Sequence, residues 1–215
     1  MPKATAANSR ARILDAAERA FADMGLDGAS LRRIVRGARV NLATVYYHFG
    51  SKEGLMAAVF ERRFGPLKQE SLKLLRDFER EAQGRPLSVE RVLEALLLPA
   101  LRLAGTASAR SQAVMRLVGR LVSEPNRKIQ ELLHRRHQEV REAFVAAMHR
   151  SLPQIPKADL RWRFTLLWGA LAFVLCHPAE TEGVTGVCCK PASTKTLRRQ
   201  MMAMFSAGFR APPAA

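Results

Sequence analysis

The sequence predicts an all-α protein, because helical periodicity recurs along its 215 residues and no segment shows the apolar alternation of a β-strand. Serine or asparagine stands where several helices should begin, and glycine or proline stands where they should end. The pattern divides into a small N-terminal helical domain, a long connecting helix and a larger C-terminal domain. The expected helices cover residues 9–24, 31–38, 42–49, 52–82, 88–103, 108–122, 124–150, 159–176 and 194–209.

The first three predicted helices have clear apolar faces and clear ends. Helix 9–24 should end at Gly25, and its inward residues are Ile13, Leu14, Ala17, Phe21 and Met24. The hydroxyl of Ser30 is expected to cap the second helix, and the side chain of Asn41 is expected to cap the third. Ser51 can cap the long helix that follows.

Residues 30–55, SLRRIVRGARVNLATVYYHFGSKEGL, combine two short helices with a three-residue turn and a polar, aromatic cluster. The phenols of Tyr46 and Tyr47 lie beside Thr44 and His48, a set that suits phosphates and base edges if the helix enters a DNA major groove. The spacing therefore fits a helix-turn-helix motif. It fits an ordinary helical hairpin with a polar surface equally well.

The long helix should start at Lys52, which lies in its first turn, where backbone N–H groups also suit a phosphate. Gly65 and Pro66 should kink or divide this helix, because proline removes a helical hydrogen bond. The helix would connect the N-terminal domain physically to the C-terminal one.

The C-terminal helices are more apolar. Helix 88–103 should bend at Pro99, and Pro125 is well placed in the first turn of its helix. The segment 160–176 is apolar nearly all round, so it should be buried on two sides. A loop rich in glycine, threonine and proline covers 178–193, before a last helix rich in methionine.

The formal charge of +16 and the pI of about 11.1 favour a polyanionic partner. The basic excess is spread along the chain, so charge alone does not locate a site. The first ten residues lack the apolar core of a signal peptide, and the apolar run 164–176 is short for a bilayer. With three cysteines, these features predict a cytoplasmic protein with reduced thiols and no membrane association.

Residues 9–55 resemble the DNA-binding domain of the TetR family of bacterial regulators. SRARILDAAERAFADMGLDGASLRRI is similar to the family's first helix and the start of its second, and VNLATVYYHFGSKEGL is similar to its recognition helix and fourth helix. The resemblance implies a homodimer that binds double-stranded operator DNA. It also implies a repressor that a small molecule, bound in the C-terminal domain, releases from DNA.

The resemblance assigns roles to individual residues. Phosphate contacts fall on Thr44, Tyr46, His48 and Lys52, and the residues nearest the bases are Arg32, Leu42, Ala43 and Tyr47. Ser30, Arg39 and Asn41 complete the expected DNA-binding set. Arg39 departs from the family pattern, which has glycine in the turn. If φ is positive there, arginine costs on the order of 1 kcal/mol, which a phosphate contact can offset.

The expected organisation is a disordered arm over 1–8, a helix-turn-helix domain over 9–52, an effector-binding and dimerisation domain over 53–210 and a disordered tail over 211–215. In the family the last two helices form a four-helix dimer interface. Here the expected interface residues are Phe164, Leu167, Leu171, Phe173, Met201, Met204 and Phe205. An ordinary intramolecular core is the alternative for these residues.

The C-terminal region also resembles the PsrA-like branch of the family, whose regulators respond to long-chain fatty acids. The similar segments are RFGPL, VMRLVGRL, LRWRFTLLWGALAF and FSAGFRA. This resemblance implies an acyl-shaped pocket for a fatty acid or acyl-CoA. Its expected residues are Met115, Arg116, Leu117, Phe144, Arg163, Phe164 and Trp168, for which packed core and solvated arginines are the alternative.

Three other functions are weighed from the sequence. Cys188 and Cys189 can make a redox-responsive regulator, with Cys176 as a resolving thiol. The basic charge alone would give a non-specific nucleic-acid binder. The set of Cys176, His177, Cys188 and Cys189 matches no common zinc spacing, so no metal or cofactor is expected. No catalytic constellation stands out, which argues against an enzyme.

Overall fold

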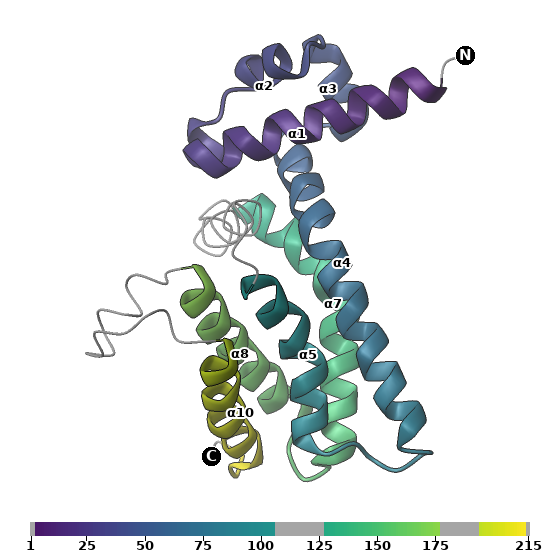
Figure 1. The fold of residues 1–215 in the computed structure, drawn as a ribbon, viewed down its shortest axis with the longest axis vertical. Helices are drawn as coiled ribbons and strands as arrows, with labels where there is room; N and C mark the ends of the chain where they lie inside the picture. Colours follow the sequence, from purple (N-terminus) through teal and green to yellow (C-terminus); the bar gives the residue numbers. More distant parts are fainter. Residues whose placement is uncertain (1–2, 106–126, 177–193, 214–215) are drawn as a thin grey trace, which may run out of the picture. The chain divides into compact units, whose positions relative to one another are not determined.

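The computed structural model describes residues 3–105, 127–176 and 194–213 (Figure 1). Within these ranges every regular element is an α-helix, which confirms the all-α prediction. The helices are α1 (Lys3–Gly28), α2 (Leu31–Ala38), α3 (Leu42–Phe49), α4 (Lys52–Glu81), α5 (Val89–Ala104), α7 (Arg127–Ser151), α8 (Lys157–Cys176) and α10 (Thr194–Arg210). None of these described helices combines the length and apolar character needed to cross a membrane. The expected helix 108–122 and loop 178–193 lie outside the described residues.

Helix α1 is longer than predicted at both ends. It begins at Lys3, so the disordered arm expected over 1–8 is corrected: residues 3–8 are helical. Gly25 has φ 70° and ψ −173°, which breaks the helical geometry where a stop was expected. The helix resumes after this residue and ends at Gly28.

Helix α4 contains Pro66 and runs as one helix from Lys52 to Glu81. Of the two expected outcomes, division of the helix at Gly65 and Pro66 is therefore wrong, while a kink stays a prediction. Proline has no N–H group, so the carbonyl of Arg62 loses its usual helical donor at this point. The chain forms two compact units, and the boundary between them falls after Gly65, inside α4. A second boundary lies inside α7, after Arg136.

The first unit has a small hydrophobic core built by α1, α2, α3 and the start of α4. Its fully buried side chains come from all four helices and include Ile13, Phe21, Ile34, Val45 and Leu55. The apolar faces of the three N-terminal helices therefore pack as their periodicity predicted. Helices α2 and α3 are held in place by their side chains in this core.

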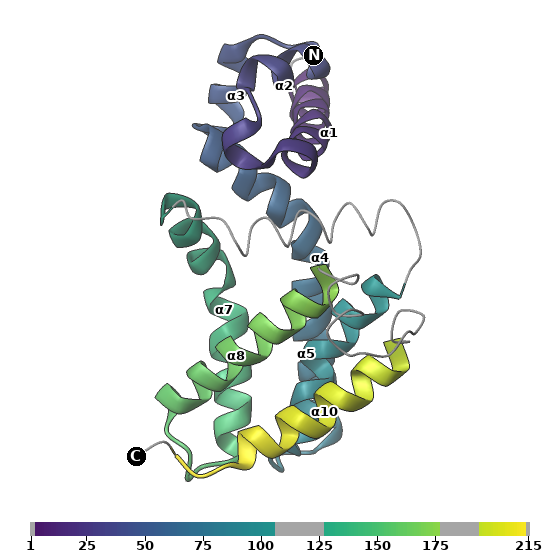
Figure 2. The same ribbon diagram turned by 90° about the vertical axis from the view of Figure 1, so that its left-hand side faces the viewer.

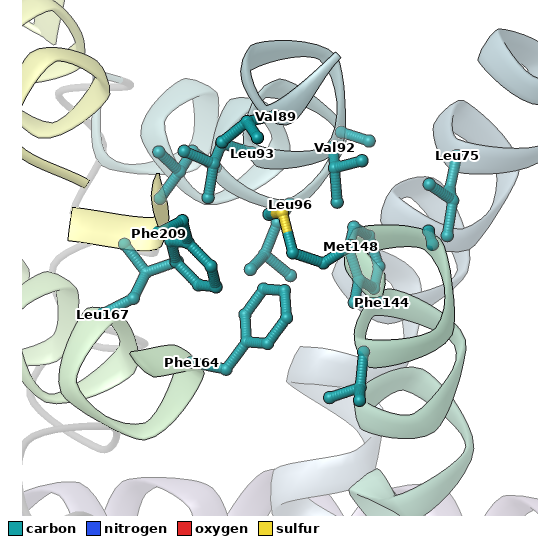
Figure 3. Packing of buried hydrophobic residues seen from close by; sticks show 14 of the residues in the cluster. Leu75, Val89, Val92, Leu93, Leu96, Phe144, Met148, Phe164, Leu167 and Phe209 are labelled. Atoms are coloured by element: carbon teal, nitrogen blue, oxygen red, sulfur yellow. The ribbon is translucent and has the colours of Figure 1, made fainter. Parts of the chain in front are cut away.

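The second unit packs α5, α7, α8, α10 and the rest of α4 around a larger core (Figure 3). Phe164 lies at its centre: its ring meets Phe209 edge-on at 4.7 Å and Phe144 at 6.5 Å between centroids. Such aromatic contacts add to the burial of apolar area. Leu93 and Met148, both fully buried, complete the surroundings.

Arg163 holds the end of the described chain. Its guanidinium donates to the carbonyl of Phe209 at 2.8 Å, of Ala211 at 2.9 Å and of Pro212 at 2.9 Å. The last carbonyls of a helix have no intrahelical partner, so this arginine caps α10. The tail predicted to be disordered over 211–215 is therefore held in place at Ala211 and Pro212.

Candidate nucleic-acid interface

Helices α2 and α3 are joined by a three-residue turn, as the sequence predicted. Asn41 caps α3, because its Oδ1 accepts from the Thr44 backbone N at 2.8 Å and from the Thr44 hydroxyl at 2.7 Å. Ser30 occupies the N-cap position of α2, but its side chain makes no capping hydrogen bond, so that part of the prediction is wrong. The start of α3 is thus fixed by a local bond, and the start of α2 is not.

The turn contains a non-glycine residue in the left-handed region. Arg39 has φ 52° and ψ 49°. This is the positive φ at which backbone strain was expected for a residue other than glycine. Arg12 of α1 reaches this turn, and its Nη2 donates to the carbonyl of Ala38 and, at 2.7 Å, to the carbonyl of Arg39. Arg12 was not among the predicted site residues. Its two acceptors lie 26 and 27 positions later in the chain, and no local sequence pattern indicates a contact over such a separation.

One side of α3 is buried and the other is open. Val45 is fully buried and anchors the helix to the first core. On the other side Leu42, Tyr46 and Tyr47 are exposed, with Tyr47 keeping 82% of its surface. Ala43 is exposed as well. Three of the four residues predicted nearest the bases, Leu42, Ala43 and Tyr47, are therefore accessible on this helix, and the fourth, Arg32, is exposed on α2.

His48 is not freely available for a phosphate. Its Nε2 lies 3.0 Å from the hydroxyl of Ser9 in α1, and its ring meets Tyr47 edge-on at 5.1 Å. A phosphate contact by His48 would have to use Nδ1 or replace Ser9. The bond to Ser9 joins the end of α3 to α1.

The beginning of α4 lies close against the end of α3. Ser51 caps α4 as predicted, since its hydroxyl accepts from the Gly54 N at 2.9 Å. A β-carbon at position 54 would lie 2.1 Å from the carbonyl oxygen of Phe49, so only glycine permits this approach. Lys52, half-buried in the first turn of α4, is thereby held next to the C-terminal end of α3.

The charges of the first unit are unevenly compensated. Arg62 and Arg63 of α4 are paired with Glu18 of α1, and Arg62 also bonds Asp15 at 2.7 Å. Partial burial works to lower the pKa of Arg62, but hydrogen bonds to Glu18 and Asp15 outweigh it and raise the pKa above its ordinary value. By contrast, Arg32, Arg33, Arg36 and Arg39 are exposed on α2 and the turn. The positive surface therefore adjoins the open face of α3, which suits a nucleic acid.

Replacing Asn41 with alanine is expected to destabilise the protein by about 1 kcal/mol, because the first turn of α3 loses its cap. Chemical denaturation would measure this loss. Asn41→Asp keeps an oxygen at the same place and serves as the control. An alanine variant as stable as the unchanged protein would show that the cap contributes nothing.

The other predicted site residues lie in the second unit or outside the described ranges. Of the expected pocket, Phe144 and Phe164 are buried core residues and Trp168 keeps 45% of its surface. The guanidinium of Arg163 donates to the carbonyls of Phe209, Ala211 and Pro212, so an effector would have to compete with these contacts. Met115, Arg116, Leu117, His177, Cys188 and Cys189 lie outside the described residues.

The expected dimer interface is corrected in part. Phe164, Leu167, Leu171 and Met201 are buried within one chain and face its own core, while Phe205 packs partly against that core. Phe173 and Met204, at 48% and 71% exposed, keep the most surface of this set. Trp162 and Leu166, which were not among the expected interface residues, keep 70% and 65% of their surfaces on α8. Their spacing of four was visible, but in a helix apolar nearly all round it did not identify the outer stripe.

Two family descriptions match the chain. Residues 13–59 match "Bacterial regulatory proteins, tetR family", and residues 94–208 match "Tetracyclin repressor-like, C-terminal domain". The second match alone covers more than half of the chain. The first includes α2, the turn and α3, where the exposed basic and aromatic residues gather.

Curated relatives are similar over about a quarter of the chain. The transcriptional repressor AcnR of Corynebacterium glutamicum is 40% identical over 52 residues, which cover 24% of this chain and 28% of AcnR. The transcriptional regulator UidR of Escherichia coli K12 is 39% identical over 51 residues, which cover 24% of this chain and 26% of UidR. These matches thus span under a third of either relative.

Solved structures share the fold over nearly the whole chain. The fatty acid degradation regulator FadR of Bacillus halodurans superposes with a TM-score of 0.63 at 16% identity, covering 93% of this chain and 98% of FadR. GusR of Salmonella enterica gives 0.60 at 22% identity, covering 92% and 95%. At such identities the likeness concerns the fold alone. Because the two family descriptions account for both the helix-turn-helix region and the C-terminal helices, the chain belongs to the TetR family of bacterial regulatory proteins.

Proposed function

We propose that this protein is a homodimeric transcriptional repressor that binds operator DNA through α2 and α3. The observation that carries the proposal is the exposed face of α3 with Tyr46 and Tyr47, together with the exposed arginines of α2. Phosphate contacts would supply most of the affinity, and residues at the open face would select the sequence.

The proposed DNA contacts follow the sequence prediction with one change of emphasis. Arg32, Leu42, Ala43 and Tyr47 would lie nearest the bases, since all four are exposed. Thr44, Tyr46, Lys52, Arg39 and the exposed Ser30 would contact phosphates. Asn41 and His48 would mainly hold α3 in place through their contacts with Thr44 and Ser9. A phosphate contact would offset the strain at Arg39.

The dimer would form through the outer faces of α8 and α10. Figure 2 looks onto these two helices, which lie in front of α5 and α7. Trp162, Leu166 and Phe173 on α8 and Met204 on α10 are large, apolar and exposed. Such side chains gathered on neighbouring helices are typical of a protein interface. Two copies meeting there would bury them in a four-helix contact.

The effector is proposed to be a small apolar molecule that binds the second unit, with a fatty acid or acyl-CoA as the first candidate. The resemblance to fatty-acid-responsive regulators supports this class, and the fold shared with FadR is compatible with it. Binding would shift the population of dimers toward a state of lower operator affinity. Helix α4 continues from the first unit into the second, as α7 also does.

Fluorescence anisotropy on the DNA upstream of the protein's own gene tests the proposal. A scrambled duplex of equal length at near-physiological salt is the competitor. We expect a clear preference for the native fragment, and release of that fragment by the correct effector. Equal affinity for both duplexes, falling steeply with salt, would favour the alternative of a non-specific basic binder. If the native fragment fails, a random-sequence selection would decide whether an operator exists elsewhere.

Tyr47→Ala is expected to lower operator affinity about ten- to a hundredfold, the usual value of a contact at a base edge. The thermal midpoint should hardly change, because this side chain is 82% exposed. Anisotropy and thermal unfolding measure the two effects. Tyr47→Phe, which keeps the ring, distinguishes an apolar base contact from a hydroxyl contact. An alanine variant with full affinity would remove Tyr47 from the interface.

A further inference from the structure

Helix α3 has a narrow hydrophobic anchor. The structure describes α3 completely, and Val45 is its one buried side chain, with Phe49 partly buried near its end. An eight-residue helix held mainly at one point can rotate about that point. Specific DNA recognition requires a fixed orientation, because base-edge contacts tolerate little displacement. Other contacts must therefore fix how α3 is aimed.

Two side chains of α1 contact the chain on either side of α3, one at the turn that precedes it and one near its C-terminal end. Arg12 donates to the carbonyls of Ala38 and Arg39, just before α3 begins. Ser9 lies 3.0 Å from Nε2 of His48, near the end of α3. Residues three apart share one face of a helix, so Ser9 and Arg12 contact the turn and α3 from the same side of α1. Together they fix the turn before α3 and the last turn of α3.

The contact by Arg12 is suited to the turn that it meets. The last carbonyls of α2 lack intrahelical donors, and a cation at a helix C-terminus is also favoured by the helix dipole. One of the two carbonyls belongs to Arg39, the residue held in the left-handed region. Both hydrogen bonds come from Nη2, whose two N–H groups lie in the fixed plane of the guanidinium. The ammonium group of lysine rotates freely and does not hold its donors in these directions.

We propose that Arg12 is a positioning residue for specific DNA binding. It fixes the turn and thereby the orientation of α3, and it does not itself contact the bases. The proposal rests on the function proposed above. It differs from a direct phosphate contact, which would depend on the charge of residue 12 and not on its shape.

The test compares Arg12→Lys with Arg19→Lys. Both variants keep the charge, and Arg19 is an exposed residue of the same helix. We expect Arg12→Lys to lose operator affinity roughly tenfold, as befits the loss of a charged hydrogen bond. Its affinity for the scrambled duplex and its salt slope should stay the same, because the number of phosphate contacts does not change. Arg19→Lys should match the unchanged protein on both duplexes.

A second readout uses the protein without DNA. Hydrogen exchange of the backbone amides over residues 39–45 should be faster in Arg12→Lys and unchanged in Arg19→Lys, at a temperature well below unfolding. Ser9→Ala, which removes the contact at the other end of α3, should lower operator affinity by a few-fold, again without a change in salt slope. This variant keeps the test valid if Arg12→Lys folds poorly.

The outcomes separate the two proposals. Equal binding of the unchanged protein to both duplexes would overturn the proposed function. Hydrogen exchange over residues 39–45 would then still show whether Arg12 holds the turn and the start of α3 in place. If the unchanged protein prefers its operator but Arg12→Lys behaves like Arg19→Lys, the positioning role is refuted. A parallel loss on both duplexes would refute it too, because it would indicate a phosphate contact or a loss of folded protein.

Discussion

Leu166→Glu is expected to convert the dimer into monomers and to remove measurable operator binding at ordinary protein concentrations. Leu166 is 65% exposed on α8, one helical turn from Trp162 at 70%. A carboxylate at this place would be buried without a partner when two copies meet, which opposes association strongly. A monomer also lacks the second helix-turn-helix domain of the dimer. Binding through two linked domains can exceed the affinity of one domain by about 10² to 10⁴.

Light scattering after size exclusion and anisotropy on the operator would measure both effects of Leu166→Glu. Gln138→Glu adds the same charge to an exposed position of α7 and should leave the dimer and its DNA affinity intact. Circular dichroism should show full helical content in both variants. If Leu166→Glu remains a dimer, the interface does not include Trp162 and Leu166 of α8.

Phe164→Ala is expected to reduce the free energy of unfolding by about 3–5 kcal/mol, the usual cost of removing a buried aromatic ring. The ring contacts Phe144 and Phe209 in the second core and keeps only 3% of its surface. The thermal midpoint of a chain of this size should fall by about 2–4 °C for each kcal/mol lost. Phe164→Leu, which keeps more of the volume, should lose clearly less.

The same variant separates a core residue from an interface residue. If Phe164 belongs to the core of one chain, the loss in Phe164→Ala should not depend on protein concentration and should persist in the Leu166→Glu background. A loss that disappears in the monomer would return Phe164 to the dimer interface, where the sequence analysis had expected it.

Local chemistry was the part of the sequence that predicted structure well. The cap at Asn41 involves a residue three positions away, and the left-handed Arg39 follows from the end of α2. Both depend on neighbours in the chain, so the sequence contains most of what decides them. Ser30 shows the limit, because its hydroxyl is suited to a cap that it does not form.

Contacts between distant residues were not predictable in the same way. In α8 nearly every position is apolar, so periodicity could not tell that Phe164 and Leu167 face the core while Trp162 and Leu166 face outward. Arg163 was expected at a ligand, yet it caps α10 from 46 residues away. Such pairings depend on how helices meet, and no pattern within one helix specifies that.

The two cores differ in the length of chain that they require. The buried residues of the first core all lie between Ile13 and Phe60, whereas those of the second extend from Leu72 to Phe209. Chains emerge from the ribosome N-terminus first, and cores made of nearby residues form fast. The DNA-reading core can therefore assemble during synthesis, before the last helix of the second core exists. A newly made chain would carry a folded helix-turn-helix domain for some seconds before it could dimerise. In that interval it would bind DNA only weakly, because it has a single DNA-binding domain.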